Sequence, residues 1–194
     1  MIEWPAFFLG KEYPELDRVR SEWRVIREEA LGLLPAMMWV NDNRTTGNVW
    51  AFGPLMLEEG ERTPERDQLC DVMRQRATKT MTLLHQIPTL LGCGFSLLVA
   101  HSKIDEHDHS NPFVTAILGL SPANPCWITV GGKTQHIREG ELTIFDYSQP
   151  HEVVNASDVD RLALLILLPN KARQTPPRIQ QNGSSVPCTL PSSF

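Results

Sequence analysis

The sequence predicts a mainly β domain, a barrel of strands preceded by helices, and three observations support this. Across residues 92–168, short runs rich in β-branched and aromatic residues alternate with turn residues. Across residues 16–34, apolar residues recur at helical spacing. His107 and His109 are separated by one residue and can point to the same side of a strand. His151 can join them only if a barrel brings its own strand alongside.

The N-terminal part, about residues 1–90, is predicted to be largely helical. The helix over 16–34 carries apolar side chains on one face and charged ones mostly on the other, and Gly32 and Pro35 bring it to an end. A second helix is predicted to begin at Thr63, an N-cap followed by proline, and to extend to about residue 78 or 85. We expect these helices to pack on one face of the sheet.

The strands are predicted from apolar runs that are bounded by Gly, Pro, Asn and Ser. They span residues 50–57, 95–100, 112–120, 127–130, 133–137, 142–145, 152–154 and 162–168. Gly131-Gly132 lies between two of these runs and is a strong signal for a hairpin turn. The run over 162–168 is almost continuously apolar, as expected for an interior strand.

The three histidines form a candidate metal site. A short His-x-His element, followed much later by a lone histidine, is typical of the facial ligand sets of non-haem Fe(II) sites. The alternating acids and histidines of residues 105–109 are also compatible with a solvated loop, because short metal motifs often arise by chance. The second segment favours the metal, since a strand ends near Asp146, a turn follows, and His151 begins the next strand.

Arg161 stands at the start of the most apolar strand. A guanidinium at the mouth of a buried strand needs an anionic partner, because an unpaired buried charge is costly. That partner is either a carboxylate of the protein or a carboxylate of the substrate. The histidines upstream favour the substrate.

These residues resemble those of a known family. The motif G-E-L-T-I-F-D-x-S-x-x-H-E of residues 140–152, with Arg161 ten positions after His151, resembles the catalytic domain of the aspartyl/asparaginyl β-hydroxylases. Ser96, eleven residues before His107, also fits the family pattern. The resemblance covers about residues 15–170.

The members of that family are Fe(II)- and 2-oxoglutarate-dependent oxygenases with a double-stranded β-helix, a jelly-roll or cupin-like barrel. The resemblance therefore implies that His107 and His151 are iron ligands and that Arg161, assisted by Ser96, binds the far carboxylate of 2-oxoglutarate. The implied reaction consumes O2 and oxidises an unactivated C–H bond, by hydroxylation, desaturation or cyclisation. His107, His151 and Arg161 are thus the predicted catalytic residues.

Two departures from the family pattern leave alternatives open. The family usually has glycine two residues after the first histidine, whereas this chain has His109, which could be a third metal ligand, support the site from outside, or point away. Thr115 and Ile117 stand where the family has a basic residue and a histidine. A three-His, cupin-like iron enzyme that does not use 2-oxoglutarate is the main alternative, and a catalytically silent binding module is another.

The expected substrate is a small molecule, an amino acid or an amino-acid derivative of secondary metabolism, free or bound to a carrier. The resemblance places Trp50 and Phe52 near the substrate pocket, although packing in the core would explain both aromatics equally well. Asp146 and Glu152 flank the distal histidine and could orient imidazole N–H groups or simply cap a turn.

Composition bears on several other classes of protein. A net charge of −5 without a Lys/Arg cluster argues against a nucleic-acid partner. The sequence shows neither a signal peptide nor an apolar run approaching the ~20 residues of a membrane span. The four cysteines have no metal or disulfide spacing, which favours free thiols in a reducing compartment. We therefore expect a cytoplasmic protein without membrane partners, and a homodimer is left open.

The domain organisation is predicted to be simple. Residues 1–170 form one oxygenase domain, whose barrel core covers about 92–168. Residues 171–194 are rich in Pro, Ser and Gln and lack periodicity, so they are predicted to be an extended or disordered tail.

Overall fold

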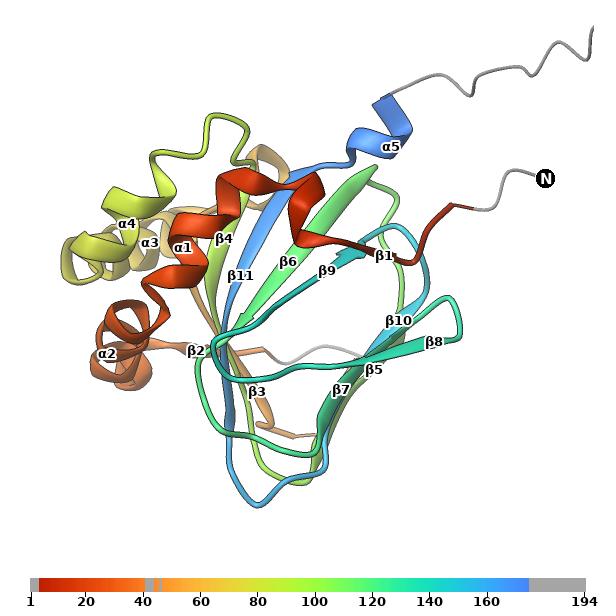
Figure 1. Ribbon diagram of the computed structural model, residues 1–194. Coiled ribbons are helices and arrows are strands. Elements are labelled where there is room, and N and C mark those ends of the chain that lie inside the picture. The colour runs from red at the N-terminus through yellow and green to blue at the C-terminus, as the bar shows by residue number, and fades with distance from the viewer. Residues whose placement is uncertain (1–3, 41–43, 46, 175–194) are drawn as a thin grey trace, which may run out of the picture.

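The computed structural model describes residues 4–40, 44–45 and 47–174. Two antiparallel sheets face each other, and helices cover the outer face of the larger one (Figure 1). The strand order is β1-β9-β6-β11-β4-β3-β2 in the large sheet and β5-β10-β7-β8 in the small sheet. This is a double-stranded β-helix with N-terminal helices on one face, and the predicted fold class is confirmed.

The elements have the following bounds. The large sheet contains β1 (Phe7–Phe8), β2 (Met38–Trp39), β3 (Trp50–Met56), β4 (Gly92–Leu98), β6 (Phe113–Gly119), β9 (Leu142–Asp146) and β11 (Arg161–Pro169). The small sheet contains β5 (Ser102–His107), β7 (Cys126–Val130), β8 (Lys133–His136) and β10 (His151–Asn155). The helices are α1 (Asp17–Ser21), α2 (Trp23–Leu33), α3 (Pro64–Arg76), α4 (Thr78–Leu84) and α5 (Lys171–Gln174). Short 3-10 turns lie at Gly10–Glu12, Pro14–Leu16, Leu34–Ala36 and Glu59–Glu61.

Strand β11 lies in the middle of the large sheet and packs on both of its faces. Leu164 and Ile166 belong to the core beneath the helices, whereas Ala163 and Leu165 pack against the core between the two sheets. Because successive side chains point to opposite faces, a strand that is buried on both sides must be apolar throughout. This explains the continuous apolar run at residues 162–168.

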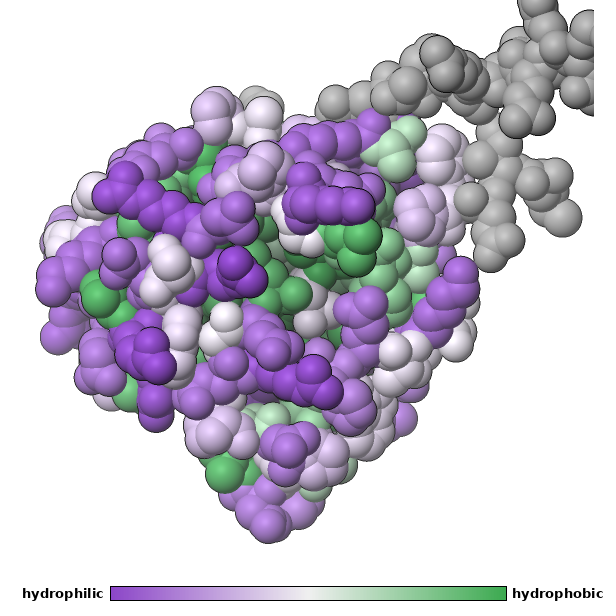
Figure 2. Space-filling view, viewed as in Figure 1, coloured by the Kyte–Doolittle hydropathy of each residue, from purple (hydrophilic) through white to green (hydrophobic). Residues whose placement is uncertain are grey.

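The helices form a layer over the large sheet, as predicted, but they are shorter than the sequence pattern suggested. The helix over 16–34 is divided near Glu22 into α1 and α2, and Ala77 separates α3 from α4. The Thr63 hydroxyl accepts a hydrogen bond from the Arg66 N–H at 3.3 Å, so the predicted N-cap is confirmed. Across the described residues, none of the helices is long and apolar enough to cross a lipid bilayer. In the view of Figure 2, hydrophilic side chains cover most of this helical layer.

The hairpin predicted at Gly131-Gly132 is confirmed, since β7 and β8 pair directly across it. Gly131 and Gly132 have φ angles of +52° and +76°, the left-handed values that such a two-residue turn requires at both positions. The sequence pattern missed β1 and β2, which are only two residues long, and gave β5 only as one of two interpretations. The lone buried apolar residue of β5 is Ile104, which is too weak a pattern to distinguish a strand from a loop.

Candidate metal centre

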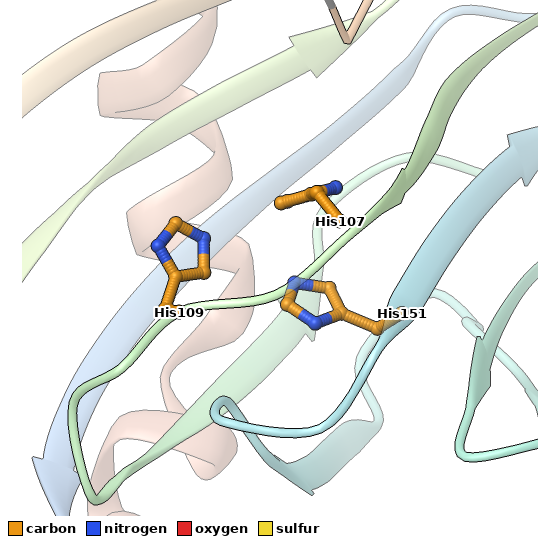
Figure 3. A group of neighbouring side chains, drawn as sticks. All are labelled: His107, His109 and His151. Carbon is orange, nitrogen blue, oxygen red and sulfur yellow. The ribbon is translucent and has the colours of Figure 1, made fainter.

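His107 and His151 lie opposite each other on neighbouring strands. His107 is the last residue of β5, His151 is the first of β10, and the two are partners in the antiparallel register. Their rings point to the same side, with centroids 4.3 Å apart (Figure 3). Opposite residues in a sheet share one face, so the pairing of β5 with β10 brings together two histidines that are distant in sequence.

His109 turns toward the same point from the loop that follows β5 (Figure 3). Its ring stacks on Tyr147, with centroids 3.8 Å apart and an interplanar angle of 11°. One ligand nitrogen from each of His107, His109 and His151 lies within 4.8 Å of the other two. The structure thus brings together the three predicted metal ligands, and Tyr147 supports the third.

Hydrogen bonds fix the tautomers of the two strand histidines. The Nδ1 atom of His107 lies 2.7 Å from the Asp105 carbonyl oxygen, and that of His151 lies 2.8 Å from the Gln149 carbonyl oxygen. A carbonyl oxygen can only accept, so Nδ1 carries the proton in both rings. The Nε2 atom of each neutral ring then presents a lone pair, which is the form of imidazole that binds a metal.

Burial keeps two of these rings neutral. It lowers the pKa of His109 to about 4, and the neighbouring charge of His107 adds to the effect. It also lowers the pKa of His151 to about 3, although the hydrogen bond to the Gln149 carbonyl acts in the opposite direction. The Nε2 atom of His109 is buried and has no hydrogen-bond partner among the described residues. A neutral, unsatisfied imidazole nitrogen is suited to coordinate a cation.

The turn that precedes His151 is built on the Asp146 carboxylate, which is fully buried. It accepts hydrogen bonds from the Ser148 backbone N–H at 3.1 Å, the Ser148 hydroxyl at 2.8 Å and the Gln149 amide at 3.2 Å. Arg173 of α5 adds an ion pair at 2.9 Å. Burial acts to raise the pKa of Asp146, but these bonds outweigh it and lower the pKa.

Arg161 lies in a cavity of about 70 Å³ that His107 and His151 also line. Its side chain is buried, its Nε has no hydrogen-bond partner, and no carboxylate of the described chain lies within ion-pair distance of it. Burial accordingly lowers the pKa of Arg161. Ser96 and Thr115 line the same cavity. The cavity therefore combines an unpaired cation with hydroxyl groups, beside the three histidines.

The two hydroxyl groups differ in their surroundings. Ser96 on β4 accepts a hydrogen bond from the Trp50 indole N–H at 3.0 Å, so its own hydroxyl proton is available to a ligand. The Thr115 hydroxyl on β6 is buried without a partner in the described part of the chain. Ile117, which like Thr115 stands at a departure from the family pattern, lines the cavity as an apolar wall.

The sequence left two interpretations open for Asp146 and Glu152, orienting imidazole N–H groups or capping a turn. Backbone carbonyls of Asp105 and Gln149 accept the imidazole N–H bonds, so neither carboxylate has the first role. Asp146 caps the turn, which was the other interpretation of this residue. Tyr147 was not among the predicted site residues, and its place directly after Asp146 is the one sequence signal that its ring could reach the site.

The remaining histidines lie elsewhere. His101 is exposed, has a φ of +55° and binds Asp158 at 2.8 Å. His85 and His136 are exposed as well. The predicted pocket aromatics, Trp50 and Phe52, line a second and larger cavity next to the histidines, one that also includes His109 and Tyr147.

Comparisons with solved structures give matches of low sequence identity. The chain is similar to a Pseudomonas putida prolyl-4-hydroxylase, with a TM-score of 0.49, 16% identity, and coverage of 77% of this chain and 87% of that one. It is also similar to an oxidoreductase of the 2OG-Fe(II) oxygenase family from Burkholderia pseudomallei, with a TM-score of 0.46, 17% identity, and coverage of 69% and 72%. A cupin domain of Cnp3 from Schizosaccharomyces pombe gives a TM-score of 0.44 and 11% identity, and the match covers 73% of this chain and 74% of that one.

Comparisons of the sequence are more specific. A human aspartyl/asparaginyl beta-hydroxylase is 26% identical over an alignment of 182 residues that covers 84% of this chain. The chain spans only 23% of the length of that human protein. The family model described as aspartyl/asparaginyl beta-hydroxylase matches residues 20–170, which include the three histidines, Arg161, Ser96 and Thr115. The predicted family is therefore confirmed, and this chain belongs to the aspartyl/asparaginyl β-hydroxylase family.

Proposed function

We propose that the protein is a non-haem Fe(II)- and 2-oxoglutarate-dependent oxygenase that oxidises an unactivated C–H bond of a small amino acid or amino-acid derivative. One observation carries the proposal. The imidazoles of His107, His109 and His151 converge beside a cavity that holds the buried guanidinium of Arg161. This guanidinium lacks a carboxylate partner in the described chain. Such an arrangement suits one metal cation and one carboxylate ligand.

The residues fit iron. Imidazole nitrogens bind Fe(II), and facial sets of three protein ligands leave coordination positions open. In this proposal the ligands are His107, His151 and His109. The fixed Nδ1–H groups of the two strand histidines support it, because they aim both Nε2 atoms away from the backbone. The unsatisfied Nε2 of His109 supports the third ligand.

The residues also fit a dicarboxylic acid. The planar guanidinium of Arg161 can grip a carboxylate through two parallel hydrogen bonds. The hydroxyl of Ser96 can donate a further bond, since the indole of Trp50 already uses its acceptor side. Thr115 adds a hydroxyl where the family pattern has a basic residue. We propose that Arg161 binds the far carboxylate of 2-oxoglutarate, with Ser96 and Thr115 assisting.

The catalytic role of the protein is to bind, orient and exclude water. Bound Fe(II) and 2-oxoglutarate together supply the oxidative chemistry, in which O2 is reduced, the co-substrate is decarboxylated to succinate and CO2, and a C–H bond is oxidised. His107, His151 and His109 fix the place of oxidation, and Arg161 fixes the co-substrate. Phe145, Ile117 and Val153 line the small cavity with apolar surface, which keeps bulk water from the reacting atoms.

The small substrate and the cytoplasmic location are parts of the same proposal. The larger cavity measures about 360 Å³, which suits a compact molecule. Cys70, Cys93 and Cys126 are buried free thiols, as expected in a reducing compartment, and Cys188 lies outside the described residues.

A second candidate function is a three-His iron oxygenase or oxidase that does not use 2-oxoglutarate. The convergence of His109 with the other two histidines favours it. Arg161 argues against it, because such an enzyme would leave this buried guanidinium without an anion. The two functions differ in whether succinate accumulates during turnover.

The test is the purified protein with Fe(II) and 2-oxoglutarate. Under anaerobic conditions we expect a weak visible charge-transfer band, and its titration gives the affinity for 2-oxoglutarate. Arg161→Gln should weaken that affinity by on the order of 100-fold, since a charged hydrogen-bonded pair is lost. An exposed arginine on the helical layer, in the variant Arg20→Gln, is the matched control. An unchanged affinity in Arg161→Gln, or O2 consumption by amino acids without succinate, would refute the proposal.

A further inference from the structure

The larger cavity adjoins the histidines and extends away from the Arg161 cavity. It lies over the inner face of the large sheet, with apolar and aromatic side chains on its walls, including Phe52, Met56, Leu165 and Leu167. His109 and Tyr147 close the end next to the histidines. A molecule in this cavity would therefore place one end next to the histidines and its body against apolar walls.

Four charged side chains also line this cavity. Arg66 forms an ion pair with Glu61 at 3.1 Å, and the Arg44 guanidinium stacks on the Trp50 ring at 4.8 Å from its centroid. Glu58 is different. It is half-buried. Among the described residues, its one side-chain hydrogen bond is a long one of 3.4 Å from the Asn111 amide, and no Lys or Arg pairs with it.

The environment of Glu58 disfavours its negative charge. Burial raises the pKa of Glu58, and the negative charge of Glu61 raises it further, so its surroundings disfavour the carboxylate. A half-buried carboxylate beside an aromatic-lined cavity is a suitable receptor for an ammonium group.

We propose that the larger cavity binds the substrate and that Glu58 pairs with a positively charged amine of that substrate. The substrate is then a small molecule with an apolar body and an ammonium group that reaches Glu58. This inference deepens the proposed function and rests on it for the identity of the oxidising centre. The recognition itself requires only the cavity and Glu58.

Binding of simple probes tests the recognition without catalysis. The protein loaded with Zn²⁺ is titrated with 3-phenylpropylamine and with the neutral 3-phenylpropanol of similar shape, and binding is followed by calorimetry and by the fluorescence of the tryptophans. We expect the ammonium probe to bind at least roughly tenfold more tightly than the alcohol. In Glu58→Gln, which keeps the shape but removes the charge, we expect this preference to disappear.

The matched control is Glu65→Gln, because Glu65 is exposed on α3 and does not line the cavity. It should retain the preference for the ammonium probe, and Glu58→Asp should retain part of it. Equal binding of the two probes to the unaltered protein, or the same preference in Glu58→Gln, would overturn the inference. Since the probes need neither Fe(II) nor O2, a failure here is distinct from a failure of the succinate assay.

Discussion

The guanidinium of Arg173 lies 2.9 Å from the carboxylate of Asp146, across 27 positions of sequence. Through this pair, α5 holds the turn that leads to His151, because the same carboxylate fixes Ser148 and Gln149. The Gln149 carbonyl in turn fixes the ring of His151. Arg173 lies beyond residues 20–170, which match the family model.

We therefore predict that Arg173→Gln weakens metal binding, since the turn that orients His151 loses its outer anchor. Partners that orient a ligand directly are worth about 10–100-fold in affinity, and Arg173 acts one step further out, so we expect roughly three- to tenfold. The measurement is the dissociation constant for Co²⁺ from its visible absorption. Lys171→Gln is the control, because Lys171 is on the same helix but contacts Glu15 and the Glu12 carbonyl. Equal losses in both variants would mean that α5 acts only as a general anchor.

Much of the fold could be predicted because its signals are local. The continuous apolar run of β11, the Gly131-Gly132 turn and the Thr63 cap each depend on a few neighbouring residues. The tail predicted over residues 171–194 is a different case. Lys171–Gln174 form α5, and residues 175–194 lie outside the described part of the chain.

The details of the site could not be predicted in the same way. The pairing of His107 with His151 depends on the register of β5 against β10, which no local pattern specifies. The stacking of Tyr147 on His109 depends on the path of two loops. The Asp146–Arg173 pair joins a turn to a segment whose composition resembles a tail. Such contacts are set by tertiary packing, and residue type and spacing give no signal for them.

The three histidines are predicted to share one metal ion. His107→Ala and His151→Ala should each weaken binding of Co²⁺ by on the order of 100-fold or more, since several ligands share the total binding free energy. His109→Ala should weaken Co²⁺ binding to a similar extent, because the Nε2 atom of His109 has no other partner among the described residues. His136→Ala is the control, as His136 is exposed on β8. An unchanged affinity in His109→Ala would remove His109 from the ligand set.

The stability of the metal-free protein should fall as the pH falls below about 6.5. His151 has a pKa of about 3 in the fold, whereas an unfolded chain has the ordinary value near 6.5. Between these values the unfolded state binds a proton that the native state does not, so acid favours unfolding by up to about 1.4 kcal/mol per pH unit. His109 acts in the same direction, since its pKa is lowered to about 4.

Urea denaturation with a chelator present, at about pH 7, 6 and 5, measures this dependence. His151→Asn should flatten the decline, because an amide does not titrate in this range. His136→Asn should leave the decline as it is. A stability of the unaltered protein that is constant between about pH 7 and 5 would contradict the prediction.

Two glycines are predicted to respond to alanine in opposite directions. A methyl group at Gly119, the last residue of β6, would overlap with the backbone carbonyl of Arg138, which cannot move independently of its chain. Gly119→Ala should therefore lower the free energy of unfolding by about 1–3 kcal/mol. Gly32 lies in α2 with no heavy atom within 4 Å of an added methyl group, so Gly32→Ala should raise the free energy of unfolding by about 0.5–1 kcal/mol.

Urea denaturation of both variants measures the difference. The pair is informative because the same substitution removes the same backbone freedom from the unfolded chain, and the two sites differ in what the methyl group meets in the folded state. The backbone N–H of Gly119 also donates a hydrogen bond to the Glu141 carbonyl, and its carbonyl accepts one from the Gly140 N–H. A displacement of Gly119 would therefore disturb the connection that leads into β9 and then to the Asp146 turn. Gly119→Ala should consequently weaken Co²⁺ binding as well, and Gly32→Ala should not. If Gly119→Ala were as stable as the unaltered protein, the close approach of Arg138 to β6 would be wrong.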